Sequence, residues 1–480
     1  MCSFQKLNKI KQYVAAPLQF LFDTSLLLLV SLWPIEILTA TPVLFYFQLP
    51  NLDLLSWMWV IIAIVCRFFL PEYFRPFFKD KLFTAVVFML GVWIVIVYHS
   101  APFCDYFSFL WTERFILWLV LIWITSRIRW SPRLMRKIAY SIFGIAVLIS
   151  LHAIVEQVAW FRWHKALSYQ PQLFAGTHHL RSSATFYNPN LLAAFLTLTI
   201  PITVWLDFYH SRLQRKRWNL LFATTLAVQA IALGYTYSRS GFVLLAGFAI
   251  TLIVLGLLHS QLRLARVFLV VRASFLLLVL LGFVLTNPTM QHRMYSLVPK
   301  KLTDSKELTP EHSAAVMLQD LDPQGQHIVH LPGNRIVIWR GALKLIHYFP
   351  WTGIGFGNFR HFFNWWHAHQ LVLQVTVASG LIGVGLLGIL ILILLKAWLK
   401  TCKMISLIPT EIKFADVQMM AWTTIFVTAI FSLYSLVEYF LGSISIVGLS
   451  GFFLGLLYCF SLNDNQHFLA QNQPKKVLIS

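Results

Sequence analysis

Two histidines in this sequence stand where a polar segment meets a long apolar one. His367 and His369 precede a stretch that carries no charge from Leu371 until Lys396. An imidazole has a pKa of about 6.5, so it can take a proton from a hydroxyl group near neutral pH. A histidine at such a boundary can equally be structural. His369 is therefore a candidate general base whose role depends on its surroundings.

Three arginines are expected at the same boundary. Arg181 precedes an apolar segment, Arg239 lies in a very short loop between two such segments, and Arg335 opens an amphipathic helix. Charged groups at the edge of a membrane are costly and are often functional. The planar guanidinium group pairs well with phosphate oxygens, and helix N-termini add further donors. The sequence predicts a phosphate site, although each arginine could instead pair with Glu36, Glu113, Glu156 or Glu438.

The sequence predicts neither a metal nor a cofactor. Its five cysteines form no CxxC pair or other ligand spacing. His367 and His369 are two residues apart, and a metal site built on them would need further ligands. The acidic residues between 300 and 333 lie in a polar segment that is expected to be a solvated loop.

The composition is that of an integral membrane protein. Hydrophobic residues make up 58% of the 480 residues and charged residues only 12%, whereas soluble domains carry about 25% charged residues. We expect an all-α fold with about twelve transmembrane helices. The apolar stretches lie near 18–39, 54–70, 82–98, 107–125, 138–160, 188–207, 219–237, 241–258, 267–286, 370–395, 417–440 and 444–460.

The distribution of lysine and arginine predicts the orientation. Most of the 38 basic residues fall on alternate connections that share a side with the N-terminus, and basic connections stay in the cytoplasm. The net charge of +20 is thus explained by topology, and nucleic acid is not an expected partner. Both termini are expected in the cytoplasm. Residues 1–286 hold nine spans, 287–369 form a large periplasmic loop, 370–460 hold three spans, and 461–480 form a tail.

The large loop contains two recognisable elements. Residues 334–349 have helical periodicity, with Ile336, Trp339, Leu343 and Ile346 on one face, which predicts an amphipathic helix at the outer membrane surface. The glycines of the run Gly353–Gly357 lack the spacing and the preceding strand of a dinucleotide site. They predict a tight turn that returns the chain to the next span.

The motifs together resemble the O-antigen ligase family. His369-Gln370, nine residues, and then Gly380-Leu381-Ile382-Gly383 is similar to the H-[NSQ]-x9-G-x-x-G signature of that family, which also includes O-antigen polymerases and some O-oligosaccharyltransferases. Three further pieces are similar and occur in family order: Arg181 with Phe186–Asn190, Ser238–Gly241, and Arg335 followed by Pro350–Gly355.

The resemblance implies a metal-independent membrane glycosyltransferase of the GT-C type. It would move a glycan from undecaprenyl diphosphate to lipid A-core at the periplasmic face of the bacterial inner membrane. His369 would be the general base, with inversion at the anomeric carbon. Arg181 and Arg239 would bind the diphosphate. Acceptor or phosphate contacts would come from Arg335, His367 and Asn190.

Two alternatives remain open at this point. The same chemistry could serve an O-antigen polymerase or a protein O-oligosaccharyltransferase. A protein of a different class, a transporter of a small anion such as bicarbonate, would also have many spans. The sequence shows neither an inverted repeat nor paired glycine- or proline-broken spans, which many transporters have.

Overall fold

A computed structural model gives the fold. It describes residues 2–35, 51–76, 80–165, 167, 172–173, 179–186, 188–212, 216–258, 263–295, 335–407, 415–440 and 442–462. The long helices are α1 (Cys2–Leu32), α2 (Asn51–Phe69), α3 (Lys81–Ser100), α4 (Tyr106–Arg127), α5 (Pro132–Trp163), α6 (Pro189–Arg212), α7 (Lys216–Tyr235), α8 (Arg239–Leu258), α9 (Arg263–Thr286), α14 (Leu371–Leu407), α15 (Ala415–Ser435) and α16 (Ile444–Ser461).

The short elements lie in the connections. They are the 3₁₀ turn η3 (Pro71–Tyr73), the helices α10 (Pro288–Tyr295), α12 (Arg335–Tyr348) and α13 (Phe359–Phe362), and the antiparallel strands β1 (Gln172–Leu173) and β2 (Leu180–Arg181). Among the described residues, eleven helices are long and apolar enough to cross a membrane, and α15 lies outside that set. The predicted all-α multi-pass membrane fold is confirmed. The count of twelve spans remains a prediction.

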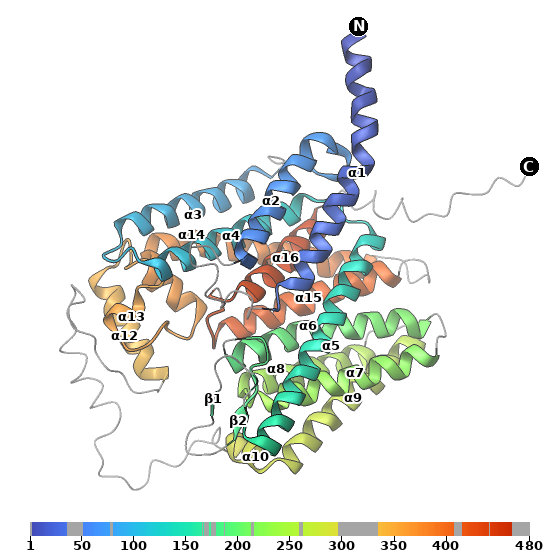
Figure 1. The fold of residues 1–480 in the computed structure, drawn as a ribbon, viewed down its shortest axis with the longest axis vertical. Coiled ribbons are helices and arrows are strands. Elements are labelled where there is room, and N and C mark those ends of the chain that lie inside the picture. The colour runs from blue at the N-terminus through green and yellow to red at the C-terminus, as the bar shows by residue number, and fades with distance from the viewer. Residues whose placement is uncertain are drawn as a thin grey trace, which may run out of the picture.

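Helices α6 and α16 form the centre of the bundle. The apolar window of α6 is 94% buried and that of α16 is 100% buried. Helix α16 packs against α4 and α14, while α6 packs against α5 and α7, and α15 contacts both central helices. In Figure 1, α2, α3, α4 and α14 lie on one side of this centre and α7, α8 and α9 on the other. Helices α12 and α13 lie beside α14 at one end of the bundle (Figure 1), which we call the site end.

Two sequence predictions lie outside the described residues, and a third needs correction. The end of the first span, 36–39, and the polar segment 300–333 lie outside them. The predicted span 417–440 is too long, because α15 ends at Ser435 and the amide of Glu438 closes a turn onto the Tyr434 carbonyl at 3.0 Å. Glu438 therefore belongs to the α15–α16 connection and not to a span.

The amphipathic helix is present, and two residues of its predicted apolar face are exposed. Helix α12 begins at Arg335 as expected, and Ile336 is 52% and Leu343 58% exposed. The face that packs on α14 and α13 consists of Val337, Ile338, Gly341, Ala342 and Leu345. Periodicity did not indicate this second face, which packs against protein. Contact of the predicted apolar face with the membrane surface remains a prediction.

The glycine turn is confirmed, and it docks onto a break in α14. Gly353, Gly355 and Gly357 all have positive φ, a conformation that suits glycine. Helix α14 is interrupted at Gly380, where φ is 67° and ψ is −171°. The carbonyl groups of Val377 and Ala378, freed by this break, accept the amides of Ile354 and Gly355 at 2.9 Å each. Backbone groups left open by a broken helix need such partners.

We expect Gly380→Ala to destabilise the protein. A β-carbon at Gly380 would overlap the carbonyl group of Trp351, and this backbone conformation costs a non-glycine residue roughly 1–3 kcal/mol. The melting temperature of the purified protein in detergent should fall clearly. Gly385→Ala is the matched control, because nothing lies within 4 Å of its added β-carbon. Equal melting temperatures for the two variants would contradict this account of the glycine signature.

Candidate active site

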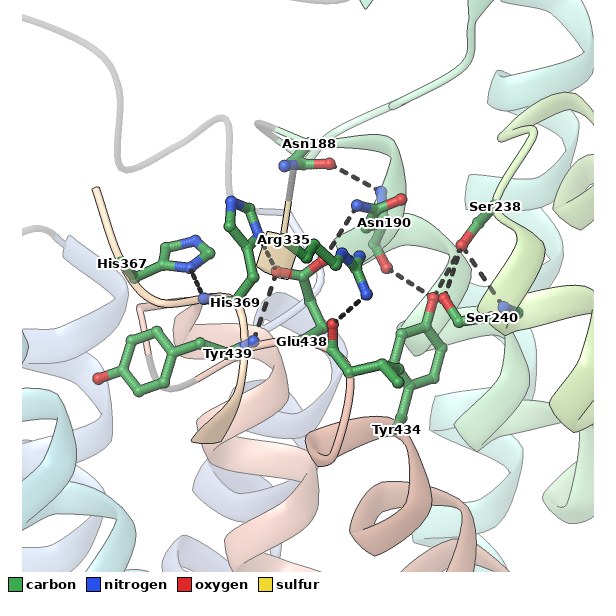
Figure 2. Close-up of polar contacts among 12 residues, drawn as sticks. Asn188, Asn190, Ser238, Ser240, Arg335, His367, His369, Tyr434, Glu438 and Tyr439 are labelled. Carbon is green, nitrogen blue, oxygen red and sulfur yellow. Dashed lines mark hydrogen bonds and ion pairs between the residues drawn. The ribbon is translucent and has the colours of Figure 1, made fainter. Parts of the chain in front are cut away.

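Glu438 lies at the centre of the polar contacts at the site end. Its side chain is buried, with only 3% of the residue exposed. One carboxylate oxygen accepts a hydrogen bond from His369 Nδ1 at 2.8 Å. The other accepts the Asn190 side-chain amide at 3.1 Å and a guanidinium nitrogen of Arg335 at 3.4 Å (Figure 2). Three of the residues selected from sequence thus meet on one carboxylate.

The charge on Glu438 is retained despite burial. Burial alone would raise its pKa, but the hydrogen bond from His369 and the nearby positive charge of Arg335 outweigh it and hold the pKa below the usual value. Hydrogen bonds to a charged form favour that form. Glu438 is therefore an ionised acceptor near neutral pH.

An ionised partner fixes the tautomer of His369. A carboxylate can only accept hydrogen bonds, so Nδ1 of His369 carries a proton, and in the neutral imidazole Nε2 carries the lone pair. In serine hydrolases, a carboxylate at Nδ1 orients the imidazole and stabilises the imidazolium that forms during catalysis. The pair formed by His369 and Glu438 therefore has the arrangement of a general base with its orienting acid.

The backbone around His369 is held in an unusual conformation. His369 has a φ of 54°, a left-handed value that is uncommon outside glycine. Its amide donates to Nδ1 of His367 at 3.1 Å. The preceding residue, Ala368, donates its amide to Gln374 at 2.8 Å and accepts the indole N–H of Trp339 at 2.9 Å. Helices α12 and α14 thereby fix the position from which the imidazole projects.

His367 lies beside His369 in Figure 2 and is not equivalent to it. Burial lowers its pKa to about 3, and the neighbouring His369 imidazole and the positive charge of Arg335 contribute to this shift. It is therefore neutral at physiological pH, as its role as acceptor for the His369 amide requires. Its ring contacts those of Trp111 and Tyr439, which also contact each other. These contacts favour a positioning role over the acceptor or phosphate contact expected from sequence.

Arg181 joins the site through Asn190. One terminal nitrogen donates to the Asn190 side-chain oxygen at 3.0 Å, and Nε donates to the Thr236 carbonyl at 3.1 Å. Burial lowers the pKa of Arg181, and the positive charge of Arg239 lowers it further. Arg239 is the first residue of α8, so it begins a helix and does not lie in a loop. Asn190 bridges Arg181 to Glu438.

One of the ion pairs that the sequence suggested as alternatives is present. Arg335 pairs with Glu438 and also donates to the Val437 carbonyl at 2.6 Å. Glu156 instead accepts the amides of Ser183 and Ala184, and Glu113 accepts the Trp57 indole. Glu36 lies outside the described residues. The pairing of Arg335 with Glu438 is part of the candidate site and not an alternative to it.

Sequence reasoning missed the central role of Glu438. It was considered only as an ion-pair partner, although it is the one charged residue in the sequence between 417 and 463. An isolated carboxylate in so apolar a region is itself a functional signal. Tyr434 was also missed. Its hydroxyl lies 3.0 Å from the Ser238 hydroxyl and contacts the Asn190 carbonyl, which connects α15 to the α7–α8 connection and α6.

Three side chains here could together hold a metal ion. His367, His369 and Glu438 place ligand atoms within 4.8 Å of one another. Both oxygens of Glu438, however, already accept hydrogen bonds from His369, Asn190 and Arg335. A cation there would also lie beside the guanidinium group of Arg335, which opposes its binding. The contacts fit a hydrogen-bonded acid–base pair better than a metal centre.

Fold and site together define a multi-pass helical membrane protein with an acid–base pair among arginines. Residues 222–388 match the family described as O-Antigen ligase. This region of the chain is therefore similar to the O-antigen ligase family, and the match supports, at family level, a membrane glycosyltransferase of the ligase and polymerase type. No curated protein matches the chain. The matched region contains Arg239, Arg335 and His369, while Arg181, Asn190 and Glu438 lie outside it.

The pH dependence of stability tests the ionised state of Glu438. Its pKa in the folded protein lies below the reference value of 4.5, so its charge stabilises the fold above that pH, and this contribution is lost as the pH falls through the folded pKa. Glu438→Gln should lower stability at pH 7 by about 1–3 kcal/mol. The difference in melting temperature from the wild type should shrink at pH 4. A pH-independent difference would contradict the assignment.

Proposed function

We propose that this protein transfers a glycan from undecaprenyl diphosphate to a lipid A-core acceptor at the periplasmic face of the bacterial inner membrane. The observation that carries the proposal is the hydrogen bond between His369 and Glu438, beside Arg335 and linked through Asn190 to Arg181. The family match supports the reaction class. The donor, the acceptor and the side of the membrane are part of the proposal.

In the proposed reaction His369 acts as the general base. A hydroxyl oxygen of the acceptor forms a bond to the anomeric carbon, while the bond from that carbon to the diphosphate oxygen breaks, with inversion. The electron pair leaves with the diphosphate, and the hydroxyl proton passes to Nε2 of His369. Glu438 stabilises the resulting imidazolium, in the way that a buried carboxylate supports a catalytic histidine.

In this mechanism the arginines stabilise the diphosphate leaving group. Negative charge on the diphosphate grows as the glycosidic bond breaks, and donors already in position stabilise such developing charge. Arg181 is held by Thr236 and Asn190, so its guanidinium group is oriented before the substrate arrives. We assign Arg181 and Arg239 to the diphosphate. Arg335, which is less buried and contacts Glu438, is assigned to the acceptor or the phosphate.

The depth of the site favours transfer over transport. The α14 start, the α6 start, the α7–α8 connection and the α15–α16 connection supply its residues, and all are helix ends or connections. Transporter sites usually lie near the middle of the membrane. The polymerase and the protein oligosaccharyltransferase remain variants of the same chemistry, which differ from the ligase in the acceptor.

A bacterium lacking its own copy of this gene provides the test. Wild-type protein should restore polymer on lipid A-core, whereas His369→Ala should give free core with accumulated lipid-linked polymer and an unchanged level of protein in the membrane. His347→Ala, an exposed histidine in α12, is the control and should behave as wild type. Full activity of His369→Ala would refute the base. Core bearing a single repeat in the deletion strain would identify a polymerase.

A further inference from the structure

The short helix α10 and the corner before it are hydrogen-bonded to the α7–α8 connection. Asn287, between α9 and α10, accepts the amide of Met290 at 3.0 Å and donates to the Tyr237 hydroxyl at 3.2 Å. Tyr237 itself has a φ of 51°, so this connection adopts a specific and uncommon conformation. The corner between α9 and α10 is thereby held beside the residues that precede Arg239.

Arg293 of α10 reaches the same connection as Arg181. Its Nε donates to the Tyr237 carbonyl at 2.7 Å, and Nε of Arg181 donates to the adjacent Thr236 carbonyl at 3.1 Å. Arg239 follows two residues after Tyr237. Two neighbouring carbonyl groups therefore anchor two guanidinium groups around the start of α8. The anchoring orients these side chains, which come from segments far apart in the sequence.

Arg293 also lies within electrostatic reach of the other site arginines. Burial lowers its pKa to about 10, and the positive charges of Arg181, Arg239 and Arg335 contribute to that shift. Arg293 remains charged near neutral pH. Like charges held close together destabilise one another, and a multiply charged anion among them would relieve this repulsion. Guanidinium groups pair with phosphate oxygens through parallel hydrogen bonds.

We propose that Arg293 is a further binding residue of the donor site, where it binds the diphosphate of the lipid-linked substrate together with Arg181 and Arg239. This inference rests on the proposed function. A site with three such cations should prefer two linked phosphoryl groups to one. It should therefore bind inorganic pyrophosphate more tightly than inorganic phosphate.

Binding of the two probes to the full-length protein in detergent tests this inference. By titration calorimetry, the wild type should bind pyrophosphate at least about tenfold more tightly than phosphate, and Arg293→Gln should weaken pyrophosphate binding about tenfold, which is about 1.4 kcal/mol. In a transfer assay the same variant should raise the KM for the lipid-linked donor more than it lowers kcat. Arg162→Gln, an exposed arginine at the end of α5, is the control and should change neither.

The other outcomes separate this inference from the proposed function. If Arg293→Gln keeps normal pyrophosphate affinity and donor KM while Arg181→Gln loses both, Arg293 has no role in binding and the proposed function stands. If Arg181→Gln, Arg239→Gln and Arg293→Gln all transfer normally, this inference and the assignment of the other two arginines to the diphosphate both fail, while the transfer activity itself stands. If Arg293→Gln does not fold, the same binding measurement is made on Arg293→Lys. It keeps the charge without the paired donors, so an affinity equal to wild type would overturn the inference. Equal affinities of the wild type for phosphate and pyrophosphate would overturn the preference for diphosphate.

Discussion

The structure of the site depends on one buried carboxylate that is kept charged. Glu438 is enclosed by protein, and burial of an unpaired charge is costly. His369, Asn190 and Arg335 satisfy its two oxygens. These residues come from the start of α14, the start of α6 and the start of α12, so the carboxylate joins three segments that are distant in sequence. If Glu438 lost its charge, the imidazole of His369 would no longer be held in its orientation. Arg335 would also lose its ion pair with Glu438.

The glycines of the family signature help to fix the position of His369 through the backbone. Gly380 interrupts α14, and the opened carbonyl groups receive the turn that contains Gly353 and Gly355. This docking fixes the chain between α12 and α14, and that segment includes His367 and His369. The signature therefore combines the candidate base His369 with the break at Gly380 that helps to position it. Its spacing reflects the length of helix between the imidazole and the docked turn.

Much of the fold could be predicted from sequence because a membrane restricts it to long apolar helices. The starts of α12 and α14 and the glycine turn followed from periodicity and composition. Other features could not be predicted. The buried face of α12 depends on where α13 and α14 pack, and the end of α15 depends on a turn inside an apolar stretch. Shared depth suggested that His369 and Arg335 were neighbours, but the contact through Glu438 required the α15–α16 connection to lie between them. Arg293 gave no sequence signal, since it follows a segment that resembles an ordinary helix end.

The most direct test of the account is a double-mutant cycle on the rate of glycan transfer by the purified protein. His369→Ala, Glu438→Gln and the double variant are compared with wild type at saturating donor and acceptor. If Glu438 acts through His369, its substitution lowers kcat in the wild-type background and has almost no further effect when His369 is already alanine. Residues that act as one unit show such non-additivity. Full activity of Glu438→Gln, or losses that multiply in the double variant, would contradict the account.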